Sequence, residues 1–549
     1  GNLRRPDMTP EAQLEILDAM TMQPVDVQFK NTVNYQSFDL PKNGNTTVNW
    51  QITVPADVTA VMVRITAQAG NHSDGEEVML PILTNRMLLT ETMPLPINGN
   101  ETKNYNFKSL TDANSSTTQK NYRLTLEFTS NPAWYALQAL PWLESREKEN
   151  SDQLFNRYFA NSIAGFVANS SPKIKSVFET WKNASPEALL SNLEKNQELK
   201  ALVIEETPWL MEAKNESEQK QRLALMFDLN RLSSEKSAAL RKLQQTQSPN
   251  GGWSWFEGMP ESRYITQWIV TGMGKLHYLK VNDLNEDNES KQMVQQAVNY
   301  LSTRLDEDYR RLLKEASNQV NTPGNKKSGN RKNAADNQDE IKKYLDGDHL
   351  GYEHIQFLYA LSYLSGVVQP NKQAEEAITY FSTQARKYWN TRSLYAQGMI
   401  ALWAGRSGDN KTTQSILASL REKSITSEEM GTYWRDNTGG YFWYQAPIET
   451  QALMIELFGE MGNLSISTGS ANNSEVDQMK TWLLKQKQTQ SWPTSTATTE
   501  AIYALLLKGT NWLQTIPAVR ITAGNKTIDV AKAGDIKTEA GTGYFKTSW

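Results

Sequence analysis

The chain has 549 residues and a mass of 62.2 kDa, which suggests roughly three or four domains. Its 57 Lys and Arg nearly balance its 61 Asp and Glu, so the net charge is −4, and no basic run offers a face for nucleic acid. The absence of cysteine excludes disulfides, thiol nucleophiles and iron–sulfur clusters, and four histidines leave little for metal sites. We therefore expect no cofactor, no metal and no catalytic residue.

The N-terminal segment, residues 1–24, predicts a helical lead-in from a domain cut off upstream, with its helix running from Glu11 to Met22. The chain begins with Gly1 instead of Met, and no signal-like apolar segment follows. We therefore expect a piece of a longer protein. No apolar stretch reaches the ~20 residues that span a bilayer, so a membrane anchor would lie outside these residues.

Residues 25–130 show the period-two alternation of β-strands. Val61, Val63 and Ile65 alternate with Met, Arg and Thr, and a similar pattern recurs over 124–128. Loops rich in Asn and Gly separate the runs. The pattern predicts the strands of an antiparallel β-sandwich.

From residue 131 to about 510 the period is helical. Five predicted helices are apolar on almost every side, so each needs covering on both sides by an outer layer or a crowded ring. They are Ile265–Leu276, Ile355–Leu364, Leu394–Ala404, Ala452–Phe458 and Ala501–Leu507. Their centres recur at roughly 45-residue intervals, one interval being about twice as long, which favours repeated helical hairpins. An irregular helical bundle is the alternative.

Two further segments complete the organisation. Residues 317–340 have almost no large apolar side chain, which predicts a disordered loop within the helical part. Residues 511–549 return to a strand pattern, with a hairpin around Gly524. So short a segment cannot form a sandwich alone. We expect it to complete the earlier β unit, with the helical part inserted between the strands.

Several long segments resemble those of bacterial alpha-2-macroglobulins. Gly70–Ile97 resembles the strands upstream of their thioester domain, and Gln153–Gly165 resembles the helix after the thioester motif. Leu240–Leu276 and Trp482–Leu506 are similar to the helical thioester-domain pattern. The resemblance spans roughly residues 25–530. It implies a multidomain α and β fold in which an α/α-toroid, a terpenoid cyclase-like helical barrel, is inserted into a macroglobulin/CUB-like antiparallel β-sandwich.

The resemblance also implies a function. In this family a protease cuts a bait region, the molecule rearranges, and an internal Cys–Gln thioester captures the protease. We therefore expect an endopeptidase inhibitor of the bacterial periplasm or cell envelope, with proteases as partners. The bait region, and a lipid anchor if the full-length parent has one, would lie outside these residues.

The sequence departs from the family at the thioester motif, Cys-x-Glu-Gln. The aligned residues are Asn150, Ser151, Asp152 and Gln153. A thioester needs a thiolate, and an amide nitrogen is essentially non-nucleophilic, so covalent capture by this route is excluded. No histidine lies near Ser151 in sequence, which favours a polar loop that has lost its chemistry. If this loop is buried, Asp152 should pair with a neighbour such as Arg157.

Aromatic residues offer a second hypothesis. The segment from Gln247 to Trp253 resembles the Gln…Gly-x-Trp motif of terpene cyclases, which staples helices together. The alternative is a binding face on the toroid, used by an envelope scaffold module to hold a peptide, a glycan or a partner protein. Its candidate residues are Trp253, Trp255, Trp443 and Tyr444.

A toroid hydrolase is a third, disfavoured class. It would need two convergent carboxyls, and the inward candidates are Glu257, Asp436, Glu449 and Glu500. Glu449 and Glu500 both lie near helix starts, where the helix dipole explains an acid without catalysis. We therefore expect the protein not to be an enzyme.

Overall fold

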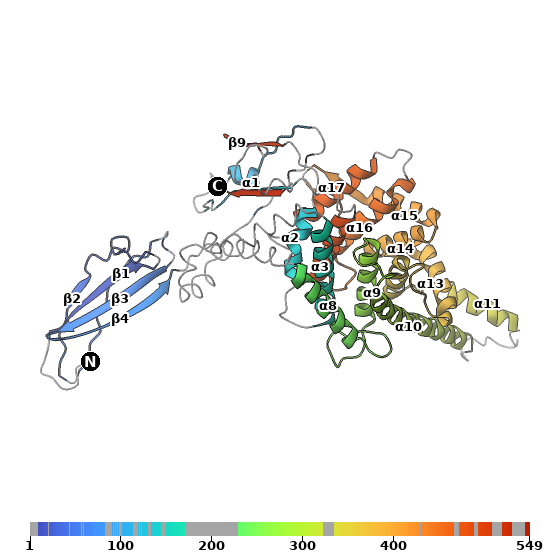
Figure 1. Cartoon of the computed structure of the whole chain (residues 1–549), viewed down its shortest axis with the longest axis horizontal. Coiled ribbons are helices and arrows are strands. Elements are labelled where there is room, and N and C mark those ends of the chain that lie inside the picture. Colours follow the sequence, from blue (N-terminus) through green and yellow to red (C-terminus); the bar gives the residue numbers. More distant parts are fainter. Residues whose placement is uncertain are drawn as a thin grey trace, which may run out of the picture. The chain divides into compact units, whose positions relative to one another are not determined.

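The computed structural model describes residues 9–19, 21–42, 44–55, 58, 60–82, 101–112, 123–129, 133–143, 150–170, 229–321, 334–428, 430–465, 471–487, 492–507, 519–529 and 544–548, with a few single residues between 91 and 121. The chain divides into two compact units, residues 1–91 with 180–222 and residues 92–179 with 223–549. The described part of the first is a β-sheet, and the second is mostly helical (Figure 1). No described helix is long and apolar enough to cross a membrane.

The first unit contains a four-stranded antiparallel sheet with the order β2–β1–β3–β4. Its strands are β1 (Glu11–Asp18), β2 (Tyr35–Ser37), β3 (Ala60–Ala69) and β4 (His72–Pro81). Leu14, Ile16 and Val61 form its hydrophobic core with Phe29 and Val58. The alternation predicted for Val61, Val63 and Ile65 is confirmed as β3.

The predicted helix from Glu11 to Met22 is wrong, because this segment contains β1, a strand of the sheet. In the register Leu14 lies opposite Ile65 and Ile16 opposite Val63. The local sequence is rich in helix formers, yet its apolar side chains at alternate positions are buried against β3. Tertiary packing overrides local propensity here, and the segment belongs to this unit instead of to an upstream domain.

In the second unit, all five predicted apolar helices are present. They are α9 (Arg263–Tyr278), α12 (Tyr352–Tyr363), α14 (Leu394–Arg406), α16 (Pro447–Met461) and α18 (Ser495–Leu506). Together with α3 (Ser151–Ser170) they contact one another in a closed cycle, α3–α9–α12–α14–α16–α18–α3. Burial on all sides explains their composition, since every residue from Ile265 to Leu276 of α9 is buried.

A second layer of helices packs on this ring. Its members are α2 (Ala133–Leu143), α8 (Leu229–Thr246), α10 (Asn288–Asn321), α13 (Glu375–Tyr388), α15 (Asn410–Lys423) and α17 (Ala471–Lys485). They contact α18, α3, α9, α12, α14 and α16 respectively. One outer helix for each ring helix is the arrangement that repeated helical hairpins predict.

The predicted disordered loop over 317–340 is wrong at both ends. Residues 317–321 form the end of α10, and residues 334–340 begin α11 (Ala334–Leu345), which packs against α10. Residues 322–333 lie outside the described residues. The composition of both ends is polar because a helix of the outer layer needs only one apolar side.

Three buried tryptophans repeat one contact between the layers. The indole N–H of each donates to a leucine carbonyl in the last turn of the outer helix that precedes it. The pairs are Trp253–Leu243 at 2.8 Å, Trp434–Leu420 at 2.8 Å and Trp492–Leu483 at 2.9 Å. The repeated contact fixes the loop between each outer helix and the ring helix that follows.

Strands flank the helices in sequence. β5 (Thr125–Thr129) pairs antiparallel with β10 (Tyr544–Ser548), while β8 (Arg520–Ala523) and β9 (Lys526–Asp529) form the predicted hairpin around Gly524. Side chains of β5 and of the hairpin share one hydrophobic cluster. β10 therefore pairs with β5, and the hairpin packs beside it. Strands of the predicted 25–130 unit fall in both compact units, β2–β4 in the first and β5 in the second.

Candidate functional site

The segment aligned with the thioester motif is the start of a ring helix. Asn150 precedes α3, and its Oδ1 accepts a hydrogen bond from the Gln153 backbone N–H at 2.8 Å, which is the geometry of an N-cap. Ser151 is buried, and its N–H donates to the Trp255 carbonyl at 3.1 Å. The predicted polar loop is thus a capped first helical turn, held against the loop that carries Trp255.

Asp152 contacts a neighbouring ring helix. Ser495 at the start of α18 donates its hydroxyl to the Asp152 carboxylate at 2.9 Å. Burial raises the pKa of Asp152, and the Ser495 hydrogen bond partly opposes this. The partner is therefore Ser495, where Arg157 was expected. The Oε1 atom of Gln153 is buried and has no hydrogen-bond partner among the described residues.

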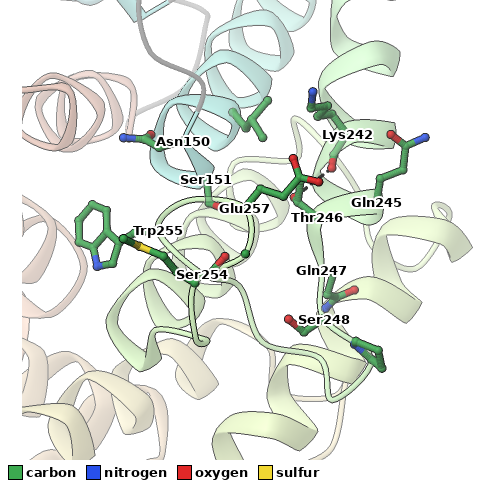
Figure 2. Close-up of a pocket in the computed structure, with 14 residues that line it drawn as sticks. Asn150, Ser151, Lys242, Gln245, Thr246, Gln247, Ser248, Ser254, Trp255 and Glu257 are labelled. Carbon is green, nitrogen blue, oxygen red and sulfur yellow. Dashed lines mark hydrogen bonds between the residues drawn. The ribbon is translucent and has the colours of Figure 1, made fainter.

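A pocket of about 370 Å³ opens beside this turn. Asn150 and Ser151 lie on one side, the last turns of α8 with Lys242 and Gln245 on another, and the loop 254–259 closes it. Figure 2 shows the Glu257 side chain extending from that loop toward α8. The pocket thus brings the degenerate motif together with part of the predicted aromatic face.

Trp253 was predicted to lie on a binding face of the toroid, and this is wrong. This side chain is completely buried, and its indole N–H is used in the contact with Leu243. Gln247 completes the staple, since its Nε2 donates to the Gly251 and Met293 carbonyls at 2.9 Å each. The helix-stapling role predicted for this motif is the one observed, and Trp253 lies on no surface that could bind a ligand.

The other aromatic candidates lie in one continuous cluster. Trp255 stacks on Tyr264 with ring centroids 5.8 Å apart, and Tyr264 lies 5.4 Å from Trp443. Trp443 also contacts Tyr352 at 6.2 Å, and Tyr352 stacks on Tyr444 at 3.6 Å. Trp255, Trp443 and Tyr444 are therefore brought together.

This cluster covers one end of the ring. Trp443 contacts Tyr264, Tyr352 and Tyr395, which stand in the first two positions of α9, α12 and α14. Trp443 itself belongs to the loop before α16. Three ring helices therefore start around one indole, and aromatic packing closes this end.

Of the four acidic candidates, two lie inside the ring. Glu257 and Asp436 are exposed, whereas Glu500 is buried in an ion pair with Lys275. Burial, with a smaller contribution from the negative charge of Glu500, raises the pKa of Glu449 to about 7. The same burial raises the pKa of Tyr264 and Tyr395 above the ordinary range.

Deeper in the ring lies a buried polar network that the sequence patterns did not reveal. Glu456 accepts hydrogen bonds from the Tyr359 hydroxyl at 2.7 Å and from Tyr363. Arg406 donates to Glu456 at 2.5 Å and to Glu460 at 2.6 Å. The sequence did contain a signal for this network, because single charged residues lie within otherwise apolar helices. A charge at such a position requires a buried partner.

The described residues contain no group of three or more His, Cys, Asp or Glu side chains that could hold a metal ion. His354 instead links helices. Its Nε2 lies 3.1 Å from Asp308, which also accepts from Arg263 at 2.5 Å, and its Nδ1 accepts from the Gly351 N–H at 2.9 Å. Asp308 thus joins α9, α10 and α12.

Neither a protein-family model nor a curated protein sequence matches the chain. Solved structures do: alpha-2-macroglobulin of E. coli in its native conformation, at 10% identity and a TM-score of 0.37, and Salmonella alpha-2-macroglobulin reacted with methylamine, at 11% and 0.36. Both matches cover 100% of this chain and 26% and 27% of the respective neighbour. The structural neighbours are thus bacterial alpha-2-macroglobulins, of whose length this chain spans about a quarter.

Proposed function

We propose that the chain is part of an alpha-2-macroglobulin-like endopeptidase inhibitor that lacks a functional thioester and captures proteases without a covalent bond. The observation that carries the proposal is the turn from Asn150 to Gln153. This turn begins a ring helix, and the resemblance aligns it with the family's motif, with Asn150 at the position of the cysteine. The bacterial periplasm or cell envelope is the proposed location.

The chemistry of this turn supports the loss of covalent capture. A thioester forms when a thiolate attacks the glutamine carboxamide carbon and ammonia leaves. The Asn150 nitrogen is an amide whose lone pair is delocalised, and its side-chain oxygen caps α3. Ser151 Oγ has no described hydrogen-bond partner, so no base is in place to activate it. Gln153 therefore keeps an ordinary, unactivated carboxamide.

We propose that the helical part is an α/α-toroid inserted into a β-sandwich. The closed cycle of six ring helices and the outer helix on each support the toroid. The pairing of β5 with β10, which come before and after these helices, supports the insertion. In an inhibitor of this kind the toroid would be the domain that moves when a protease cuts the bait region.

We also propose that the chain is not an enzyme. A toroid glycosidase needs two carboxyls facing a substrate across free space. Glu500 is occupied by Lys275 and Glu456 by Arg406, and tyrosine side chains fill the space between them. Trp443 covers the end at which Glu449 lies. The acids of the ring interior are therefore engaged in packing.

The full-length parent protein tests the proposal. It is incubated with several endoproteases, and residual cleavage of a large protein substrate is compared with that of a small peptide. Caging without a bond predicts that large-substrate cleavage falls, peptide cleavage persists, and denaturing gels show no covalent adduct. Methylamine should leave the protein's mass unchanged, whereas an alpha-2-macroglobulin with an intact Cys-x-Glu-Gln motif should take it up. Persistence of both cleavage activities would refute inhibition.

A second candidate is an envelope scaffold module that binds a peptide, a glycan or another envelope protein through the aromatic end of the ring. Exposed aromatic side chains favour it: Tyr441 is 94% exposed, Phe442 52% and Trp255 41%. Apolar patches of this kind mark interaction sites more often than scattered single residues do. If the full-length parent did not inhibit proteases in the assay above, binding through this aromatic end would become the favoured function.

A further inference from the structure

The pocket beside Asn150 contains several polar groups that the fold leaves unused. The Asn150 Oδ1 caps α3, but its Nδ2 has no described acceptor. The Ser151 hydroxyl, the Gln245 amide and the Glu257 carboxylate likewise have no described hydrogen-bond partner. Both donors and acceptors thus line one cavity. At about 370 Å³, it lies near the lower end of the roughly 300–1,000 Å³ usual for ligand sites.

One wall of the pocket is an aromatic side chain held in place. Tyr264 stacks on the Trp255 ring with an interplanar angle of 19°, and Trp255 is nevertheless 41% exposed. Its backbone carbonyl is fixed by the Ser151 N–H, and Ser254 Oγ donates to the Phe256 carbonyl at 2.7 Å within the same loop. The indole is therefore positioned before any ligand arrives, which limits the entropy lost on binding.

The charge of the pocket restricts the ligand. Lys242 is its basic lining residue and Glu257 its acidic one, so neither an anion nor a cation finds a concentrated opposite charge. No described strand edge lines it, as an extended peptide would need. The groups fit a neutral ligand with many hydroxyls and an apolar ring face. Sugars have this chemistry, because ring C–H groups pack on an indole while hydroxyls bond to amides and carboxylates.

We propose that this pocket is a binding site for a neutral saccharide, in which Trp255 carries one sugar ring and Asn150, Gln245 and Glu257 bind hydroxyls. Figure 2 shows the Trp255 ring on the side of Asn150, and Glu257 turned toward Lys242 and Thr246. The site adjoins the turn that the resemblance aligns with the family's thioester motif, and binding to it is reversible.

The test uses the 549-residue chain itself and a set of neutral disaccharides: cellobiose, lactose, maltose, mannobiose and N,N′-diacetylchitobiose. Saturation-transfer difference NMR at millimolar ligand identifies the binder, and calorimetric titration gives its affinity. Trp255→Ala should weaken binding about tenfold or more, and Glu257→Gln should weaken it measurably while leaving an exposed, isosteric side chain. Tyr35→Ala, which removes an exposed aromatic on β2, outside both the pocket and the aromatic end of the ring, should bind like the wild type.

Three results would overturn the proposal: no saturation transfer from any of these disaccharides, binding that survives both pocket variants, or binding of inorganic phosphate in preference to every sugar. Circular dichroism of each variant shows whether its helices are intact. The proposal does not depend on protease inhibition. That activity is measured on the full-length parent with proteases, so each hypothesis can fail while the other stands.

Discussion

Lys275 on α9 and Glu500 on α18 form an ion pair inside the ring, with only 2% and 3% of their side chains exposed. The two helices are the ring neighbours of α3 on either side. The Lys275 ammonium also lies 4.6 Å from the centre of the Tyr503 ring. One buried pair therefore connects the two helices that flank α3 and its first turn, Asn150 to Gln153.

Removing one partner of this pair should destabilise the protein strongly. In Glu500→Gln the Lys275 charge stays buried without compensation, and such changes cost about 3–5 kcal/mol. Urea unfolding followed by circular dichroism measures the loss. Glu307→Gln is the matched control, because the Arg304–Glu307 pair has side chains 42% and 52% exposed and should change stability by less than about 1 kcal/mol. Equal effects of the two variants would show that Lys275 and Glu500 are hydrated in solution.

Two glycines separate the effect of backbone conformation from that of close packing. Gly251 and Gly258 have φ values of +94° and +85°. A Cβ at Gly251 would lie 2.1 Å from the Gln296 carbonyl oxygen on α10, whereas at Gly258 nothing lies within 4 Å. Gly258→Ala should therefore cost about 1–2 kcal/mol for the left-handed conformation alone. Gly251→Ala should cost clearly more, because the stapled loop must move away from α10.

Thermal and urea unfolding of both variants measure the difference. A similar loss of stability in the two would contradict the close approach of the Gly251 loop to α10. Unchanged stability of Gly258→Ala would mean that its loop adopts another conformation in solution.

The ring helices could be predicted because helices that are buried on all sides consist almost entirely of apolar residues. A helix such as α9, with twelve consecutive buried residues, has no polar side, and this is visible without a structure. The staple at Trp253 was predictable from its motif for a different reason. Gln247 and Trp253 lie close together in the sequence. The strand β1 was not predictable, because its partner β3 is supplied by residues about fifty positions away, and the segment's local propensity favours a helix.

The candidate site was only partly predictable. The resemblance singles out Asn150 to Gln153, but Ser495, which binds Asp152, lies 343 residues farther along the chain. The pairing of Lys275 with Glu500 spans 225 residues. Patterns within one helix indicate that a charge is buried there. They do not identify its partner, which depends on how the ring closes.

Asn150 should contribute to stability through its cap. Asn150→Ala removes the oxygen that accepts from the Gln153 N–H and should cost about 1 kcal/mol. Asn150→Asp keeps an acceptor and adds a negative charge at the helix start, so it should be neutral or slightly stabilising. Urea unfolding of both variants checks the order. Equal stability of Asn150→Ala and the wild type would contradict the cap, because it would mean that the Asn150 side chain does not stabilise the first turn of α3 in solution.

Stability should depend on pH through Glu449. Burial near Tyr264 and Tyr395 raises its pKa in the folded protein to about 7, against 4.5 for the ordinary group. The folded state therefore holds the proton more tightly than the unfolded state, and the free energy of unfolding falls as pH rises from about 4.5 to about 7. The full loss is on the order of 3 kcal/mol, reached above that range.

Glu449→Gln cannot ionise, so it should match the wild type below pH 4.5 and be more stable above pH 7. Unfolding of both proteins across this range gives the difference directly. A constant difference between Glu449→Gln and the wild type at all pH values would mean that Glu449 titrates as an ordinary, hydrated acid.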